Sequence, residues 1–301
     1  YENKWFMVVA GGPLRIYSST DLIKWECEST YADLHTECPD LYPIQYQEET
    51  KWVLSRGGRY YKIGDFKEVD GKWTFVPDEA YKTSDGIMNF GNDSYAAMTY
   101  YVQDFGTKEN PTIPELVELN WMNTWADGFC NAVANTVGQD FNGTFNLNLQ
   151  LGLTMDSNGN YILTQTPVKE YESLRDTKKA ITLNNETISA SNDLFKDFNE
   201  SSYEIVAHFM PGEATTEVGF NVRVGNGEKT VIKYNLNNET FTIDRSQSGT
   251  IIRSSLNVMN QSNVTRNGAA SIDLHKNVDG DSVDDFTTHY SVGGAAQVFP
   301  S

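Results

Sequence analysis

The segment from residue 36 to residue 44 holds the side chains best suited to chemistry. It reads Thr36-Glu37-Cys38-Pro39-Asp40-Leu41-Tyr42-Pro43-Ile44. Pro39 biases the residue before it toward extended backbone, so we expect Glu37 at the end of a strand or in an extended loop. Residues three apart in an extended segment face opposite sides, so Glu37 and Asp40 are not expected to form a carboxylate pair. A second carboxyl group for paired acid/base chemistry must therefore come from elsewhere.

Each polar side chain of this segment has an alternative role. Glu37 can act as a general acid or base, yet it is one of 41 acidic residues, most of which should be solvated surface groups. Asp40 can brace its own loop or contact a bound molecule. Cys38 can tune the surroundings of the neighbouring carboxyl group or be an inert buried thiol.

The elements that must position these residues are β-strands. Helical periodicity is nearly absent, and the short β-rich segments bounded by turn residues include 5–10, 52–55, 95–101 and 161–164. Turn signals such as Asp70-Gly71 and Asn226-Gly227 separate them, as antiparallel hairpins require. The sequence therefore predicts an all-β protein.

The strand pattern divides the chain into two parts. Segments 12–25, 52–64, 73–75 and 90–101 each combine an aromatic-rich strand with a Gly turn, which is typical of propeller blades. Segments 203–209, 217–224, 230–234 and 240–244 alternate apolar and polar residues, which is typical of a β-sandwich. We predict part of a β-propeller in residues 1–172, including a connecting segment near its end, and a β-sandwich domain in residues 173–301.

Charge and composition restrict the partners. The net charge of -18 argues against nucleic acid and anionic membranes, because their binders need clustered Lys and Arg. Aromatic residues make up 12% of the chain and suit either sugar binding or aromatic-rich edge strands. The spacing of Cys27, Cys38 and Cys130 matches no zinc site, so we predict no metal site.

The termini and surface signals bear on localisation. The first residues already read as a turn leading into a strand, so we expect the chain to begin inside a longer polypeptide. No signal peptide and no apolar run of about 18 residues occurs, so no membrane partner is predicted. Seven Asn-x-Ser/Thr sequons fit a secreted glycoprotein: Asn92, Asn142, Asn185, Asn199, Asn238, Asn260 and Asn263.

Several motifs resemble those of the β-fructosidase family, which comprises invertase, inulinase and levanase-type glycoside hydrolases. The run Glu37-Cys-Pro-Asp-Leu-Tyr42 is similar to the family's acid/base motif, and Tyr17 to Trp25 resembles the strand and turn that precede it. The stretch Gly91 to Ala97 resembles a segment whose Asp and Tyr lie at the sugar site. The stretch Asn120 to Trp125 resembles a segment that walls this pocket. The resemblance implies Glu37 as the catalytic residue and these substrate-binding residues: Asp93, Tyr95, Trp121, Trp125 and Asp40.

Each residue assigned by this resemblance also has a structural alternative. Asp93 could cap a turn, whereas Tyr95, Trp121 and Trp125 could be core residues between blades. The sequence departs from the family's pattern at two places near these residues. Thr36 stands where the family usually has Trp, and the residues after Trp125 do not continue into the family's Arg-bearing strand. The first departure bears on the leaving-group side of the pocket, and the second bears on the subsites formed by the region after Trp125.

The resemblance implies a five-bladed propeller followed by a β-sandwich, with the propeller incomplete in this chain. It also implies retaining hydrolysis of terminal β-fructofuranosyl linkages in sucrose or fructans, without a cofactor. The family's nucleophile motif of the Asn-Asp-Pro type is absent here, so the missing N-terminal segment of the same protein must supply it. Fructosyl transfer at the same site and non-catalytic fructan binding stay open as alternatives, as does homo-oligomer formation.

Overall fold

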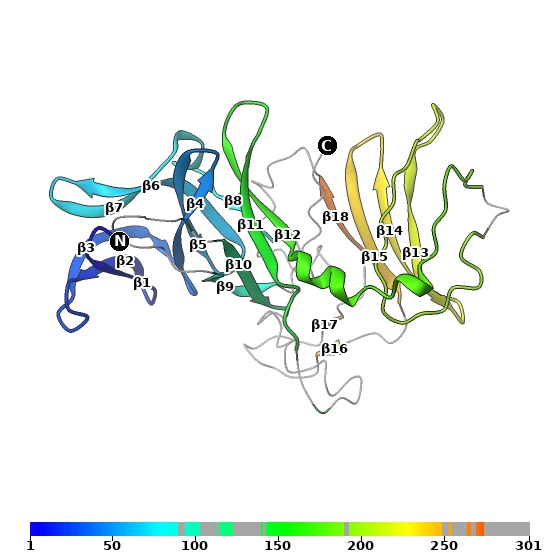
Figure 1. The fold of residues 1–301 in the computed structure, drawn as a ribbon, viewed down its shortest axis with the longest axis horizontal. Coiled ribbons are helices and arrows are strands. Elements are labelled where there is room, and N and C mark those ends of the chain that lie inside the picture. The colour runs from blue at the N-terminus through cyan, green and yellow to red at the C-terminus, as the bar shows by residue number, and fades with distance from the viewer. Residues whose placement is uncertain are drawn as a thin grey trace.

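The computed structural model describes residues 1–89, 94–102, 113, 115–122, 140, 143–189, 193–248, 253–254, 264–265 and 269–273. Within these ranges the chain is almost entirely β-structure, as the sequence predicts. Three antiparallel sheets formed by residues 5–167 lie side by side, and a fourth sheet lies beyond the segment that follows them (Figure 1).

The first three sheets are the blades of the predicted propeller. The first sheet contains β1 (Trp5–Val9), β2 (Pro13–Ser19) and β3 (Glu26–His35). The second contains β4 (Asp40–Tyr46), β5 (Glu49–Arg56), β6 (Tyr60–Val69), β7 (Lys72–Pro77) and the short β8 (Gly86–Ile87), which pairs with β6. The third contains β9 (Tyr95–Tyr101), β10 (Leu116–Trp121), β11 (Leu149–Met155) and β12 (Tyr161–Pro167).

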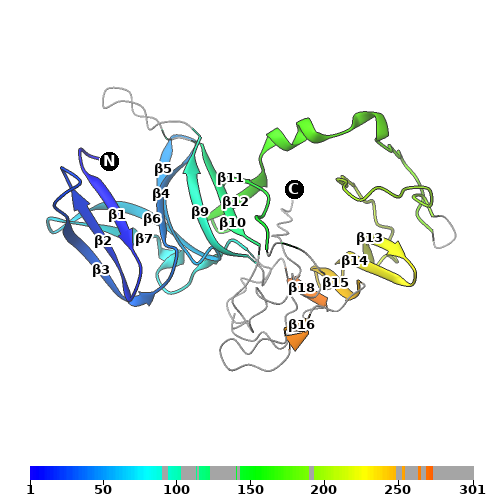
Figure 2. The same cartoon turned by 90° about the horizontal axis from the view of Figure 1, so that it is seen from below.

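The second sheet is buried on both faces, which explains its apolar strands. Val53 belongs to a cluster shared with the third sheet, whereas its neighbours Trp52 and Leu54 belong to a cluster shared with the first sheet. Successive side chains of a strand point to opposite faces, so an unbroken apolar run serves both interfaces. Stacking of the three sheets therefore supplies the hydrophobic core of this part of the chain (Figures 1 and 2).

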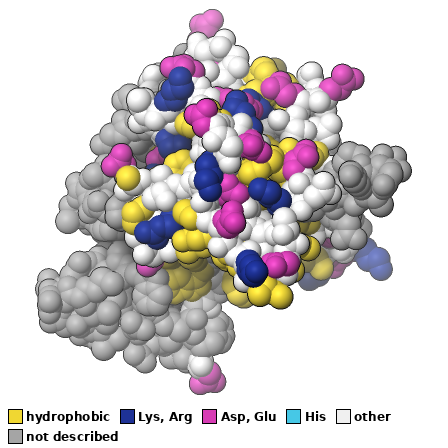
Figure 3. All heavy atoms as spheres, turned by 90° about the vertical axis from the view of Figure 1, so that its left-hand side faces the viewer, with side chains coloured by type: hydrophobic (Ala, Val, Ile, Leu, Met, Phe, Trp, Pro, Cys, Tyr) yellow, Lys and Arg dark blue, Asp and Glu magenta, His cyan; other side chains and the backbone are white. Residues whose placement is uncertain are grey.

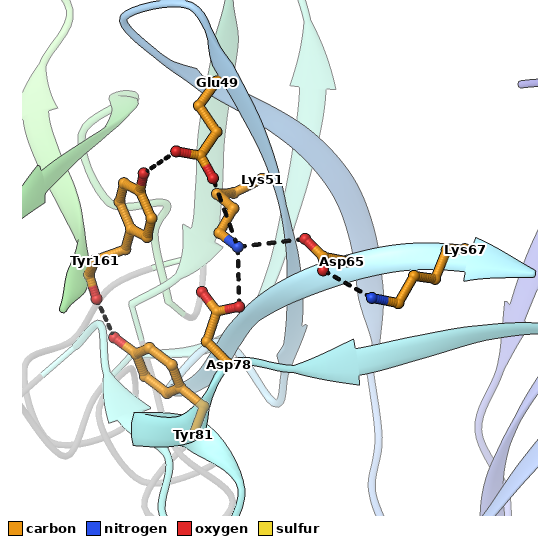
Figure 4. A network of polar contacts seen from close by, with 7 residues as sticks. All are labelled: Glu49, Lys51, Asp65, Lys67, Asp78, Tyr81 and Tyr161. Carbon is orange, nitrogen blue, oxygen red and sulfur yellow. Dashed lines mark hydrogen bonds and ion pairs between the residues drawn. The ribbon is translucent and has the colours of Figure 1, made fainter. Parts of the chain in front are cut away.

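A polar network also joins the second and third sheets. Lys51 on β5 lies 2.9 Å from Asp78, and its ammonium group lies 5.5 Å from the ring centre of Tyr161 on β12. The Tyr161 hydroxyl donates to Glu49 at 2.5 Å, and its backbone carbonyl accepts from the Tyr81 hydroxyl at 2.6 Å (Figure 4). Tyr81 lies in the short 3-10 helix η1 (Glu79–Tyr81), so this turn is tied to the edge strand of the next sheet.

Short 3-10 turns connect the propeller blades to the remaining sheet. They are η3 (Lys169–Leu174) and η4 (Thr177–Lys179), and η3 overlaps the connecting segment expected near the end of residues 1–172. The fourth sheet has the order β13 (Glu217–Gly225), β14 (Glu228–Asn235), β15 (Thr240–Gln247) and β18 (Ala269–Asp273). A separate pair comprises β16 (Arg253–Ser254) and β17 (Val264–Thr265). The domain boundary near residue 173 stays a prediction.

One expected strand of this second part is not formed. Residues 203–209 alternate apolar and polar side chains but have no regular secondary structure. The segment is fixed instead by side chains: Glu204 pairs with Arg175 of the connecting segment, and Phe209 stacks on Phe220 of β13 at 5.6 Å. Alternation alone therefore misled the prediction, because a strand also needs a neighbouring backbone with which to pair.

Acidic and basic side chains are interspersed on the face that the first sheets present to solvent (Figure 3). Apolar patches lie between them. None of the helices in the described ranges is long and apolar enough to cross a bilayer.

Candidate active site

Glu37 lies in the sharp turn that connects β3 of the first sheet to β4 of the second. It is solvent-exposed, in the kind of loop that the sequence predicts. The expectation that Cys38 is extended is wrong, because its φ is 45°, in the left-handed region. Only residues 36–39 separate the two strands, so the chain needs a sharp bend there. The bend overrides the bias from Pro39 at a cost of about 1 to 3 kcal/mol.

Two hydrogen-bonded contacts fix Glu37 although it is exposed. Its side chain accepts a hydrogen bond at Oε2 from the hydroxyl of Tyr95, at the start of β9. Its backbone carbonyl accepts from the N–H of Gly57 at 2.9 Å, and the carbonyl of Gly57 accepts from the N–H of Ala96 at 3.1 Å. Burial, followed by the bond to Glu37, raises the pKa of Tyr95, so this phenol stays a proton donor. Side chain and backbone of Glu37 are thus both tied to β9.

The turn that makes these backbone contacts requires glycine. Gly57 and Gly58 have φ values of 62° and 71°, where residues with a Cβ are strained. A Cβ on Gly58 would lie 2.4 Å from the backbone nitrogen of Ala97. The hairpin between β5 and β6 can therefore approach β9 closely only because position 58 lacks a side chain.

Asp40, at the start of β4, braces the same region. Its Oδ2 accepts from the backbone N–H of Thr99 at 2.7 Å and also from the Thr99 hydroxyl, and its Oδ1 accepts from Leu41 N–H at 3.0 Å. Burial raises the pKa of Asp40 despite these bonds. Burial, followed by the charge of Asp40, raises the pKa of Tyr101 on β9 to about 12. The contacts match the bracing role considered for Asp40, and its predicted role in substrate binding stays a prediction.

The remaining candidate residues are only partly described. Trp121 pairs with Tyr95 across β10 and β9, so it lies beside the residue that bonds Glu37. Asp93 and Trp125 lie outside the described residues. The structure therefore brings Glu37 and Trp121 together at Tyr95, the first residue of β9. It places Asp40 against Thr99, four residues further along the same strand. The sugar-contacting roles assigned to these residues stay predictions.

Sequence reasoning missed Glu118, a buried carboxyl group on β10. It is 1% exposed, and its Oε1 lies within hydrogen-bonding distance of three amide groups: Gln165 at 2.9 Å, Asn120 at 3.4 Å and Asn89 at 3.5 Å. Burial raises its pKa to about 7. Glu118 and Asn120 alternate with apolar neighbours, a pattern typical of a strand with one solvent-exposed face. No pattern in the sequence indicates that other residues cover this polar face.

Other reactive groups in the described part offer little chemistry. Cys27 and Cys38 are free thiols, and Cys130 lies outside the described residues. Burial, followed by the charge of Glu37, raises the pKa of Cys38, so the thiolate form is disfavoured. No cluster of three or more His, Cys, Asp or Glu side chains that could hold a metal ion occurs among the described residues.

Comparisons with known proteins assign both parts of the chain to the same family. The N-terminal domain of glycosyl hydrolases family 32 matches residues 1–167, and the family's C-terminal domain matches residues 170–301. A fructan beta-fructosidase of Streptococcus mutans serotype c is 63% identical over 302 residues, which cover 100% of this chain and 21% of that protein. A levanase of Bacillus subtilis is 30% identical over 271 residues, covering 82% of this chain and 37% of that protein. The chain thus spans well under half the length of these relatives.

Solved structures share the fold at low sequence identity. A sucrose-6-phosphate hydrolase from Lactobacillus gasseri has a TM-score of 0.53 and 17% identity, covering 92% of this chain and 53% of that chain. A beta-fructofuranosidase from Aspergillus kawachii, complexed with glycerol, has a TM-score of 0.54 and 15% identity, covering 81% of this chain and 52% of that chain. These similarities support the propeller and β-sandwich architecture.

Proposed function

Because the chain belongs to glycosyl hydrolase family 32, we propose that the complete protein hydrolyses terminal β-fructofuranosyl linkages of sucrose or fructans. The observation that carries the proposal is the setting of Glu37, whose exposed carboxyl group is held by Tyr95 while its backbone is held by Gly57. An exposed but fixed carboxyl group can reach a bound sugar without first having to be ordered. The similarity to a fructan beta-fructosidase and a levanase supports the substrate class.

In the proposed reaction Glu37 protonates the leaving glycosidic oxygen and then, as a base, removes a proton from the attacking water. Retention requires a second carboxyl group about 5 to 5.5 Å away, which attacks the anomeric carbon and forms a covalent fructosyl-enzyme. We place this nucleophile in the missing N-terminal segment, because neither an Asn-Asp-Pro nor an Arg-Asp-Pro motif occurs in these 301 residues. Tyr95 and Trp121 would line the fructosyl site, together with Asp93 and Trp125.

Secretion is part of the same proposal. Polymeric fructans are too large to enter a cell intact, so an enzyme that trims them must meet them outside. Detection of the protein in washed cells but not in the culture medium or at the cell surface would contradict secretion.

Replacement of Glu37 tests the proposal directly. Loss of a general acid/base lowers the rate by about 10² to 10⁴-fold, so Glu37→Gln in the complete protein should lose at least that much fructose release from sucrose, inulin or levan. Glu68→Gln, at an exposed position on β6, is the matched control and should keep normal turnover. Near-normal turnover by Glu37→Gln would refute its assignment as acid/base.

Product analysis distinguishes the alternatives. Oligosaccharides formed at high sucrose concentration would indicate fructosyl transfer, because another sugar then replaces water as the acceptor. Fructan binding by the unaltered complete protein without any turnover would indicate a binding protein and would overturn the proposed hydrolysis.

A further inference from the structure

Four polar side chains are buried together beside the acid/base, and none of them belongs to the motif that identifies it. We call Asn89, Glu118, Asn120 and Gln165 the buried polar cluster. Their exposed fractions are 0%, 1%, 2% and 5%. The three amide groups converge on one oxygen of Glu118, so this carboxyl group is the common acceptor that orients the others.

One arm of the cluster leads to the backbone of Glu37. Asn89 also donates to the carbonyl of Gly58 at 2.6 Å. Gly58 follows Gly57, whose N–H donates to the carbonyl of Glu37 at 2.9 Å and whose carbonyl accepts from Ala96. Glu118 thereby fixes, through one amide side chain, the turn on which the backbone of Glu37 is held.

A second arm leads to the side chain of Glu37. Asn120 donates to the hydroxyl of Ser94 at 2.7 Å, and Ser94 is itself only 4% exposed. The next residue is Tyr95, whose hydroxyl donates to Oε2 of Glu37. The two arms therefore reach the backbone and the carboxyl group of Glu37 by independent routes.

We propose that Glu118 is a positioning residue for Glu37, which orders both arms by accepting the amide groups of Asn89 and Asn120. The inference rests on the proposed function of Glu37. A buried amide group that loses its partner is destabilising, so loss of Glu118 would drive Asn89 and Asn120 to reorient and release Gly58 and Ser94. A misplacement of about 1 Å at the reacting group can lower a rate about 10²-fold.

Glu28 supplies a matched control. It is 8% exposed, and it accepts from the Ser18 hydroxyl, from the backbone N–H of Trp73 at 3.1 Å and from Lys4. It joins the first sheet to β7 and has no link to either arm in these contacts. A merely structural role for Glu118 would give its variants the same effects as those of Glu28.

The experiment compares Glu118→Leu with Glu28→Leu in the complete protein. We expect both to lower thermal stability, but only Glu118→Leu should lower kcat on sucrose, by about tenfold or more, with a smaller change in KM. Glu118→Gln should restore most of kcat, because its amide oxygen can still accept. Hydrogen exchange at the amides of Gly57 and Ala96 should be faster in Glu118→Leu than in Glu28→Leu.

Unchanged kcat and unchanged exchange in a folded Glu118→Leu would overturn the inference. If that variant does not fold, Asn120→Ala cuts the second arm alone and must lower kcat by at least several-fold, or the inference fails. If the unaltered protein releases no fructose, the proposed function fails, whereas the exchange rates at Gly57 and Ala96 still decide whether Glu118 orders the arms.

Discussion

Three carboxyl groups around the second and third sheets have different surroundings and therefore different chemistry. Glu37 is exposed and held by a phenol, Asp40 is tied to the backbone of β9, and Glu118 is enclosed by amide groups. Oε2 of Glu118 and Oδ1 of both Asn89 and Asn120 have no hydrogen-bond partner among the described residues. A proton on Glu118 would supply a donor in a cluster of acceptors, consistent with its raised pKa.

The raised pKa of Glu118 predicts a pH dependence of stability. The folded state keeps this proton up to a pH of about 7, whereas the unfolded state loses it near 4.5. The folded state therefore binds more protons in this window, and the free energy of unfolding falls as the pH rises from about 4.5 to about 7, by at most about 3 kcal/mol. Glu118→Gln removes this contribution, so its melting temperature relative to the unaltered protein should rise across the window.

The measurement is a pair of thermal unfolding series between pH 4.5 and 7.5, and the difference between the two proteins is the quantity of interest. Two groups on β4 interact with the charge of Glu118. The charge of Asp40 raises the pKa of Glu118, and the charge of Glu118 contributes to the raised pKa of Tyr42. Asp40 is present in both proteins, so its own titration largely cancels in the difference. A constant difference across the window would contradict the predicted titration of Glu118.

The sequence made Glu37 a candidate because it lies in a six-residue motif, and it made Tyr95 and Trp121 candidates because they lie in motifs of their own. Glu118 has no motif. Its burial depends on β10 being covered by residues distant in the sequence, such as Asn89 and Gln165. The local sequence pattern shows which residues alternate along a strand. It does not show whether residues distant in the sequence cover the polar face of that strand.

At the scale of elements, the hairpin between β5 and β6 connects the turn that carries Glu37 to β9. Its Gly57 bonds both Glu37 and Ala96 through the backbone, and Gly58 allows the close approach. Gly71, in the next hairpin, has a similar φ of 77° but has open space where a Cβ would stand. Substitutions at Gly58 and Gly71 therefore share the backbone strain of a positive φ, but only a substitution at Gly58 adds a steric clash.

Gly58→Ala and Gly71→Ala should therefore differ in a defined way. Both introduce a Cβ at positive φ, which costs about 1 to 2 kcal/mol. Only Gly58→Ala must also displace β9, so it should be the less stable variant and lose about tenfold or more in kcat in the complete protein. Chemical unfolding and steady-state assays measure both effects, and equal losses in the two variants would refute a special role for the Gly58 contact.

Strand prediction succeeded for several segments and failed where backbone pairing decides. Residues 95–101 were expected as a strand and form β9, and residues 52–55 lie within β5. Residues 203–209 have an equally good alternating pattern yet form no strand. Side-chain periodicity reports potential burial, whereas strand formation also needs a backbone partner that local sequence does not specify.

At the scale of the whole molecule, the blades depend on each other for burial. The second sheet is covered by the first on one face and by the third on the other. The first sheet has three strands, and β1 pairs only with β2 among the described residues. On β1, Trp5 is 57% exposed and Met7 is 39% exposed. An exposed apolar edge strand is a liability that further chain commonly covers.

This arrangement leads to a prediction about residues 1–301 alone. The chain spans 21% of the Streptococcus mutans relative, and a retaining reaction cannot form its covalent intermediate without a nucleophile opposite Glu37. We expect residues 1–301 to release no measurable fructose from sucrose or inulin, and activity to return when the preceding segment is supplied in the same polypeptide. The control carries Glu37→Gln in that longer polypeptide and should stay inactive. Turnover by residues 1–301 alone would show that the nucleophile lies within them, and it would overturn the proposed division of the site between the two segments.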